Sequence, residues 1–206
     1  MHLNIDKDLV LKAATKLNIE PCTIVAVATV EAVKGGFLPD GRPVILFEPH
    51  WFYKNIRNNT PLISNDLYLQ YPNLMTKSYN ETLQKKMYRN QGGASAYTNY
   101  LDPAIKIHKE QALMSCSWGA FQIMGFNYKL CGFSNVFDFV AAQEDSDSSQ
   151  VESFITFLAN TGYHKYLKNK DFAGFAYKYN GSEYKTNNYD TKMLDAYNDC
   201  IKSCSL

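Results

Sequence analysis

The spacing of apolar residues predicts two helices at the start of the chain. The segment PCTIVAVATVEAVKGG over 21–36 opens with Pro21 and closes with Gly35 and Gly36. Proline suits a first helical turn and glycine suits a helix end. Its β-branched residues would also permit a strand, but its length favours a buried helix. The segment before it, from Asp6 to Leu17, is predicted to be amphipathic, with one apolar face made of Leu9, Val10, Ala13, Ala14 and Leu17.

A short β-hairpin is expected directly after the second helix. Pro39, Asp40 and Gly41 form a turn signature within FLPDGRPVILFE, and the apolar run over 44–47 is typical of a strand. This is the most convincing hairpin pattern in the sequence. The polar stretch 58–80 contains two prolines and is expected to be rich in loops.

Capping residues and glycine stops divide the remainder of the chain into helices. Asp102 precedes a proline and the segment AIKIHKEQALM, and Ser117 is placed to cap SWGAFQIMGFNYKLC before Gly132. Further helices are expected over NVFDFVAAQ, VESFITFLAN, FAGFAYKYN and 188–203. The predicted fold class is mainly α (α+β) with one small β-hairpin. Since no repeat, linker or composition shift is visible, we expect a single domain over 1–206.

Composition and charge exclude several classes of function. Hydrophobic residues make up 46% and charged residues 20%, as in a soluble globular protein with one sizeable core. The net charge of +1 gives no electrostatic footprint for nucleic-acid binding. Charges interrupt the opening MHLNIDKDLVLKAATK, which argues against a Sec signal and a membrane span. We therefore expect synthesis in the cytoplasm without a signal peptide, and no stable membrane insertion.

The cysteines argue against a disulfide framework. Their number is odd and no signal peptide is visible. The pair Cys200 and Cys204 has no second pair or nearby histidine, so we expect it to pack on a terminal helix. No group of His, Asp or Glu forms a credible metal constellation, and the sequence predicts no metal and no cofactor. The complete set is Cys22, Cys116, Cys131, Cys200 and Cys204.

Glu31 is the most informative single residue. It is the only charged residue between Glu20 and Lys34, near the end of an apolar helix. Burial penalises the charged form of a carboxyl group, so the pKa of Glu31 should rise, and a carboxylic acid that stays protonated near neutral pH is what glycoside cleavage requires. On periodicity alone, a solvent-facing helix end is an equally good interpretation. The apolar neighbours expected to bury it are Val27, Ala28, Val30 and Val33.

Two later segments could line a sugar-binding groove. In SCSWGAFQIMG over 115–125, Gly119 would allow close approach to the backbone, and Gln122 offers a donor and acceptors for an N-acetyl or hydroxyl group. In FAYKYNG over 175–181, Tyr179 and Asn180 offer polar groups to a carboxyl group or a sugar. Each segment alone is explained as well by ordinary helix packing, through Trp118 in the first, or by a helix stop.

The three elements together resemble a known family. A Glu at a helix end, then SCSWGAFQIMGFN, then FAYKYNGSEYKTNNYDTKMLDAY, occur in this order in lysozyme-like glycan cleavers. The set is similar to goose-type lysozymes and soluble lytic transglycosylases, and most similar to the N-acetylmuramidase domain family of phage endolysins. The resemblance spans about 24–197 and includes AVATVEAVKGGFLPDGRPVILFEPHWF.

The resemblance implies a lysozyme-like helical domain without a separate cell-wall-binding domain. It implies cleavage of the bond between N-acetylmuramic acid and N-acetylglucosamine, with Glu31 as the acid. Two departures concern the site: Ala32 stands where the family usually has a Ser, and Pro49 stands where an Arg usually separates Glu48 from His50. The glycan groove is expected to include Ser117, Trp118, Gly119, Gln122, Tyr179 and Asn180.

The second carboxylate is left open between two residues. Asp40 lies nine positions after Glu31 and could position water, although Asp before Gly is also a turn former. Glu48 ends the predicted strand and is slightly preferred as a site-organising residue; its other interpretation is a helix start or a partner of His50. His50 itself is either a ligand-binding group or a partly buried neighbour of Trp51.

The leading interpretation is a peptidoglycan hydrolase, namely a phage endolysin. The alternatives are a lytic transglycosylase that leaves anhydro-muramic ends, and a catalytically inactive glycan-binding or phage structural module. The intact Glu31 argues against the inactive module. The expected partners are peptidoglycan glycan strands and a holin-type release partner, and the chain is expected to be a monomer that acts on the cell wall after release.

Overall fold

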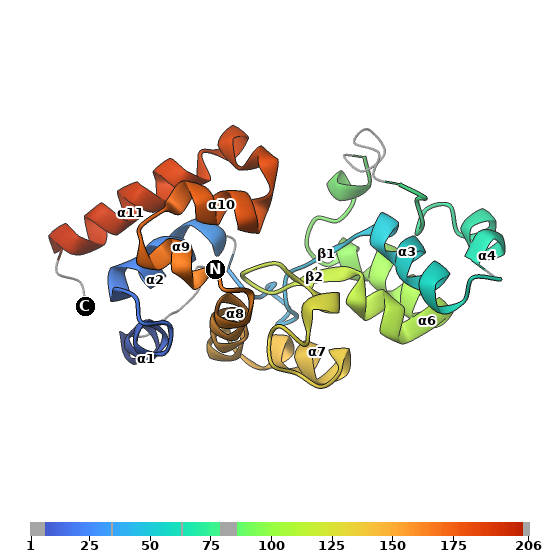
Figure 1. Ribbon diagram of the computed structural model, residues 1–206. Coiled ribbons are helices and arrows are strands. Elements are labelled where there is room, and N and C mark those ends of the chain that lie inside the picture. The colour runs from blue at the N-terminus through green and yellow to red at the C-terminus, as the bar shows by residue number, and fades with distance from the viewer. Residues whose placement is uncertain (1–6, 34, 63, 79–85, 204–206) are drawn as a thin grey trace.

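The computed structural model describes residues 7–33, 35–62, 64–78 and 86–203 (Figure 1). Helices dominate, which confirms the predicted mainly α fold class. The α-helices are α1 Lys7–Leu17, α2 Pro21–Glu31, α3 Pro49–Asn59, α4 Ser64–Gln70, α6 Asp102–Met114, α7 Val136–Asp145, α8 Asp147–Thr161, α9 His164–Lys168, α10 Phe172–Asn180 and α11 Tyr189–Ser203. A π-helical turn η1 Tyr97–Leu101 precedes α6, and 3-10 turns occupy η2 Gly125–Asn127 and η3 Ser182–Asn187.

Figure 1 shows two groups of helices joined by a small sheet. One group contains α1, α2 and α8 to α11, and the other contains α3, α4 and α6, while α7 lies beneath the junction. Helix α2 is central to the first group because α1 and α11 pack on it. Its interior residues Ala26 and Val27 are almost fully buried. It ends at Glu31, several residues before the predicted glycine pair.

The sheet has three short antiparallel strands in the order β1 Ile45–Phe47, β2 Cys116–Trp118 and β3 Ile123–Met124. Ile45 pairs with Trp118, and Ser117 pairs with Met124. The predicted strand at 44–47 is therefore confirmed. The predicted helix beginning at Ser117 is wrong, because Gly119 and Gln122 adopt positive φ values of 69° and 48° and turn the chain back as a hairpin.

The turn predicted at Pro39–Gly41 is present, but regular strands do not flank it. The Leu38 amide donates to the Arg42 carbonyl at 2.7 Å, and one isolated bridge joins Phe37 to Pro43. Strand β1 pairs with β2 instead of the segment before the turn. The stretch predicted to be loop-rich also contains α4, and the sequence did not predict α3.

A disulfide joins Cys22 in α2 to Cys200 in α11, so the expectation of no disulfide is wrong. The two helices pack side by side and bring the two Cα atoms to 5.6 Å, within the usual range for a disulfide. An odd number of cysteines does not prevent one pair from forming. Cys116 and Cys131 are free and buried, and Cys204 lies outside the described residues.

Within the described part of the chain, no helix combines the length and apolar character needed to cross a membrane.

Candidate active site

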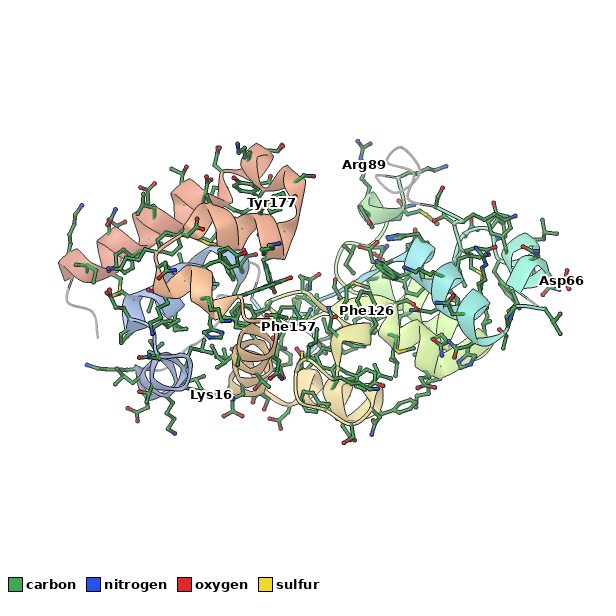
Figure 2. All side chains as sticks on the ribbon, in the orientation of Figure 1. Lys16, Asp66, Arg89, Phe126, Phe157 and Tyr177 are labelled. Carbon is green, nitrogen blue, oxygen red and sulfur yellow. A yellow bond between two sulfur atoms is a disulfide. The ribbon has the colours of Figure 1, made fainter. Side chains whose placement is uncertain are left out.

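A cleft of about 1770 Å³ lies between the two groups of helices. Arg89 lines it from one half of the molecule, and Figure 2 shows Tyr177 of α10 on the other half, across from Arg89. Sites for drug-sized ligands usually measure roughly 300–1,000 Å³, so this cleft has room for a longer, chain-like ligand. Its walls come from α2, α10 and α11 on one side, and from β1 and the segment 88–93 on the other.

Glu31 lies in the wall of this cleft, at the last residue of α2. Burial raises the pKa of its carboxyl group to about 7, and a hydrogen bond from Asn180 acts in the opposite direction. Nδ2 of Asn180 donates to Oε1 of Glu31 at 2.9 Å. The predicted direction of the pKa shift is therefore confirmed. Val33 does not contribute to the burial, since its side chain is 61% exposed just beyond the helix end.

The last turn of α10 brings Tyr179 and Asn180 to Glu31. The Tyr179 hydroxyl donates to the carbonyl of Phe121 at 2.6 Å, and its ring stacks on Phe175. Burial raises the pKa of Tyr179 well above its ordinary value, so the hydroxyl stays protonated and keeps this hydrogen bond to Phe121. Tyr179 thus ties α10 to the β2–β3 turn, while Asn180 contacts the carboxyl group.

The β2–β3 turn supplies Gly119 and Gln122 to the cleft. Nε2 of Gln122 donates to the Gly119 carbonyl at 2.8 Å, and the Ser117 hydroxyl donates to Oε1 of Gln122 at 2.9 Å. A Cβ atom at position 119 would lie 2.7 Å from the Gln150 side chain, whose Oε1 accepts from the Ala120 amide. Glycine is therefore required by the packing of the turn, in addition to its place at the cleft.

Trp118 is almost fully buried, although it is among the residues expected in the groove. Its side chain is 1% exposed, and its indole Nε1 donates to the Leu113 carbonyl at 3.0 Å. It is not part of the cleft wall. This geometry agrees with the packing interpretation of Trp118, a core residue of strand β2.

Glu48 forms a second buried carboxyl site, at the start of α3. Burial raises its pKa to about 7, although the hydrogen bond from Tyr88 acts in the opposite direction. The Tyr88 hydroxyl donates to Oε2 of Glu48 at 2.6 Å, and Nδ1 of His50 lies 3.4 Å from the same oxygen. Burial lowers the pKa of His50. Tyr88 lines the cleft but Glu48 and His50 do not, so Glu48 meets the cleft through the Tyr88 hydroxyl.

Asp40 lies outside the cleft wall, on the exposed turn after Phe37. Its Oδ2 accepts from the Arg42 guanidinium at 2.7 and 3.1 Å, and these hydrogen bonds lower the pKa of Asp40. Its neighbours Leu38 and Pro39 do line the cleft. The geometry agrees with the turn-former interpretation of Asp40.

The sequence analysis did not single out several residues of the cleft. Tyr88 and Gln91 lie in a segment without a recognisable motif, and only the fold brings them to β1. Gln91 acts as an extra strand partner, since its side chain accepts from the Phe47 amide at 2.7 Å and donates to the Phe47 carbonyl at 2.9 Å. Tyr189, on the other wall, has a pKa raised by burial and by the nearby Glu31. Among the described residues, no group of three or more His, Cys, Asp or Glu could hold a metal ion.

Comparison with known proteins assigns the chain to a family. The family model described as N-acetylmuramidase matches residues 20–200. The chain belongs to the N-acetylmuramidase family. The chain is also similar to the crystal structure of Burkholderia AP3 phage endolysin, with a TM-score of 0.86 and 35% sequence identity over 97% of this chain and 73% of that chain. A comparison with curated proteins finds no match.

The family and the structural likeness support two of the predictions. The lysozyme-like endolysin fold is confirmed. The protein is a peptidoglycan-cleaving glycosidase, as the sequence predicts at that level. For such a reaction, the arrangement around Glu31 offers a carboxyl group that is protonated near neutral pH and open to a large cleft.

Proposed function

We propose that this protein hydrolyses the β-1,4 bond between N-acetylmuramic acid and N-acetylglucosamine, with Glu31 as the general acid. The observation that carries the proposal is the position of Glu31: its carboxyl group has a pKa raised to about 7 and lies in the wall of the large cleft. A carboxylic acid with a pKa near the working pH is well suited to donate a proton to the leaving oxygen of a glycosidic bond.

Asn180 orients the acid in this proposal. Because Nδ2 of Asn180 binds Oε1 of Glu31, the other carboxyl oxygen is left to carry the proton towards the glycosidic oxygen. This hydrogen bond also takes the place of the one that the family's Ser would supply where this chain has Ala32, whose side chain offers no polar group. Gly119 and Gln122, shaped by Ser117, and Tyr179 form the adjoining part of the cleft wall, and we assign them to the glycan groove.

After bond cleavage, the charge that develops on the sugar must be captured by water or by the sugar's own hydroxyl. We assign Glu48 to the water-capturing step, acting through the Tyr88 hydroxyl, with His50 as its neighbour. Asp40 is a second candidate for positioning water. Hydrolysis by a second carboxylate requires that group to face the substrate directly or through a water molecule.

A lytic transglycosylase remains the second candidate function, and one observation favours it. Neither Glu48 nor Asp40 is part of the cleft wall, whereas Glu31 is. A site with one carboxyl group at the scissile bond suits capture by the sugar's own 6-hydroxyl, which needs no water to be activated.

Mass spectrometry of digested peptidoglycan separates these outcomes. Hydrolysis leaves reducing N-acetylmuramic ends, and transglycosylation leaves anhydro ends that are lighter by one water. We expect reducing ends from the unmodified protein and no cleavage products from a folded Glu31→Gln variant. Binding to peptidoglycan without any product would support the inactive module instead.

The likeness to a phage endolysin supports a role in host-cell lysis. In that role we expect the chain to act as a monomer on peptidoglycan glycan strands, and to reach the wall with the help of a holin-type partner that permeabilises the membrane. Expression with and without such a partner tests this: lysis should follow only in its presence.

A further inference from the structure

The cleft continues beyond Glu31 as a furrow between α2 and α11. Helix α11 packs along α2 in the opposite direction, because Tyr189 at its start lies near Glu31 and Cys200 near its end is bonded to Cys22. The residues of this extension line the same continuous cavity as Glu31. We call it the α2–α11 furrow and define it by Val25, Thr29, Lys192, Asp195, Ala196, Asp199 and Cys200.

The furrow has an uncharged part and a charged part. Small or apolar side chains of α2 and α11, namely Val25, Thr29 and Ala196, line its middle. Lys192, Asp195 and Asp199 share one face of α11, since they are spaced by three and four residues. At 1.5 Å per residue, Lys192 lies about 4.5 Å along the helix from Asp195 and about 10 Å from Asp199.

The charges follow an order along the furrow. Lys192 lies towards the Glu31 end, and Asp195 and Asp199 follow towards the disulfide. All three side chains are exposed. Within the described ranges of the chain, none of the three has a hydrogen-bond or ion-pair partner for its side-chain charge. They are therefore available to charges of opposite sign on a ligand that enters the furrow.

We propose that the α2–α11 furrow binds the peptide stem of the muramic acid residue at the cleavage site. This proposal rests on the proposed function, because the stem hangs from the lactyl group of the sugar beside the scissile bond. Counting outward from that sugar, a free glutamate carboxylate precedes the free amine of a diamino acid in the stem. The same order of opposite charges runs along α11: Lys192 first, then Asp195 and Asp199.

Distances along an extended stem agree with this order. The stem glutamate keeps its α-carboxylate free because its peptide bond runs through the γ-carboxyl group, so it spans more than the roughly 3.3–3.6 Å of an ordinary extended residue and can cover the rise of about 4.5 Å between Lys192 and Asp195. The amine at the end of the diamino acid side chain adds further reach towards Asp199. The furrow would therefore favour strands with free carboxylates and amines over bare glycan.

Two sets of variants test the proposal. Each variant is assayed on glycan strands that carry peptide stems and on strands from which an amidase has removed the stems. The quantity measured is the ratio of kcat/KM on stem-bearing strands to kcat/KM on stripped strands. Exposed ion pairs contribute modestly, so Lys192→Ala should lower this ratio by about two- to five-fold, and Asp195→Ala with Asp199→Ala should do the same. Lys202→Ala and Asp66→Ala, at exposed positions outside the cavity, are the matched controls and should keep the wild-type ratio.

Acetylation of the free stem amines makes the test specific for charge pairing. The modification should lower the ratio for the wild type and for Lys192→Ala, but leave that of the double aspartate variant where it was, because the partner charge is already gone. Wild-type ratios in both sets of variants would overturn the proposal, as would an equal loss on acetylation in every variant. Failure of the proposed function would show differently, as anhydro ends or an absence of cleavage products with the wild-type protein.

Discussion

Two partly buried carboxyl groups with similar acidity occupy different surroundings in the two groups of helices. Burial raises the pKa of both Glu31 and Glu48 to about 7. Glu31 lines the cleft and is held by the neutral amide of Asn180, whereas Glu48 lies behind Tyr88 and outside the cleft wall. A raised pKa alone therefore does not distinguish an acid that meets substrate from one that acts through a neighbour. Access to the cleft makes that distinction.

The largest expected effect is the loss of activity in Glu31→Gln. The change keeps the size and the hydrogen-bonding capacity of the side chain but removes the transferable proton. Loss of a general acid typically costs about 10²–10⁴-fold in rate. Turnover on purified peptidoglycan measures the effect, and circular dichroism confirms that the variant is folded. Near-normal turnover in a folded Glu31→Gln protein would contradict the assignment of the acid.

The pH profile sharpens the comparison between the two carboxyl groups. Glu31 donates a proton only in its neutral form, so activity should fall as the pH rises above its pKa of about 7. The fall should approach ten-fold per pH unit at higher pH, measured as kcat/KM between pH 6 and pH 9. This fall of activity at higher pH should persist in Glu48→Gln. If it disappeared in that variant, the titrating group would be Glu48.

A smaller loss of activity is expected when Glu48 is neutralised. Glu48→Gln and Tyr88→Phe should each lower kcat by about ten-fold, which is less than a general acid contributes. Tyr88→Phe removes the hydroxyl that joins the carboxyl group to the cleft but keeps the ring. The double variant should be no worse than either single variant, because both changes break one connection. Additive losses would show that Tyr88 and Glu48 act separately.

The free energy of unfolding should fall with rising pH through the ionisation of each of these two carboxyl groups. Each has an ordinary pKa of 4.5 and a folded-state pKa of about 7, so the folded protein keeps these protons as the pH rises from 4.5 to 7. The stabilising contribution of each group is present below 4.5 and is lost as the pH rises through about 7. At pH 8, each buried charge costs on the order of 3 kcal/mol.

The measurement is the thermal midpoint of unfolding at pH 8 and at pH 4.5. Glu31→Gln and Glu48→Gln should each raise Tm by about 5–10 °C at pH 8, and by much less at pH 4.5. The exposed Glu144 supplies a matched control, and Glu144→Gln should change Tm little at either pH. Unchanged midpoints in both buried variants at pH 8 would mean that burial does not penalise these charges.

The sequence predicts the group of helices that carries Glu31 better than it predicts the opposite group. Glu31 is recognisable because a single charge interrupts an apolar helix, and Asn180 is recognisable within a helix-stop motif of the family. Helix α10 begins after the cap Asp171 as predicted, and α8 stops at Gly162, because these signals are local; α8 nevertheless begins at Asp147, earlier than predicted.

The opposite side depends on contacts between distant segments. Ser117 looks like a helix cap, yet its segment becomes a strand because β1 supplies partners about 70 residues away. Tyr88 and Gln91 have no local motif that marks them as neighbours of β1. The disulfide between Cys22 and Cys200 spans 178 residues and depends on how α11 packs on α2. Local patterns cannot report such pairings.

The smallest effect is expected at Asp40, the alternative to Glu48 as the second carboxylate. Asp40 is exposed and accepts two hydrogen bonds from Arg42, and its pKa is lowered by them, so it is ionised at neutral pH. An ionised carboxylate could attract water, but its position on the turn is outside the cleft wall. Asp40→Asn should therefore lower kcat by less than two-fold, and Arg42→Gln should have an effect of similar size, because each change loosens the same turn. A loss of ten-fold or more in Asp40→Asn, without a matching loss in Arg42→Gln, would show that the carboxylate itself reaches the reacting sugar when substrate binds. The roles of Asp40 and Glu48 in the comparison would then be exchanged.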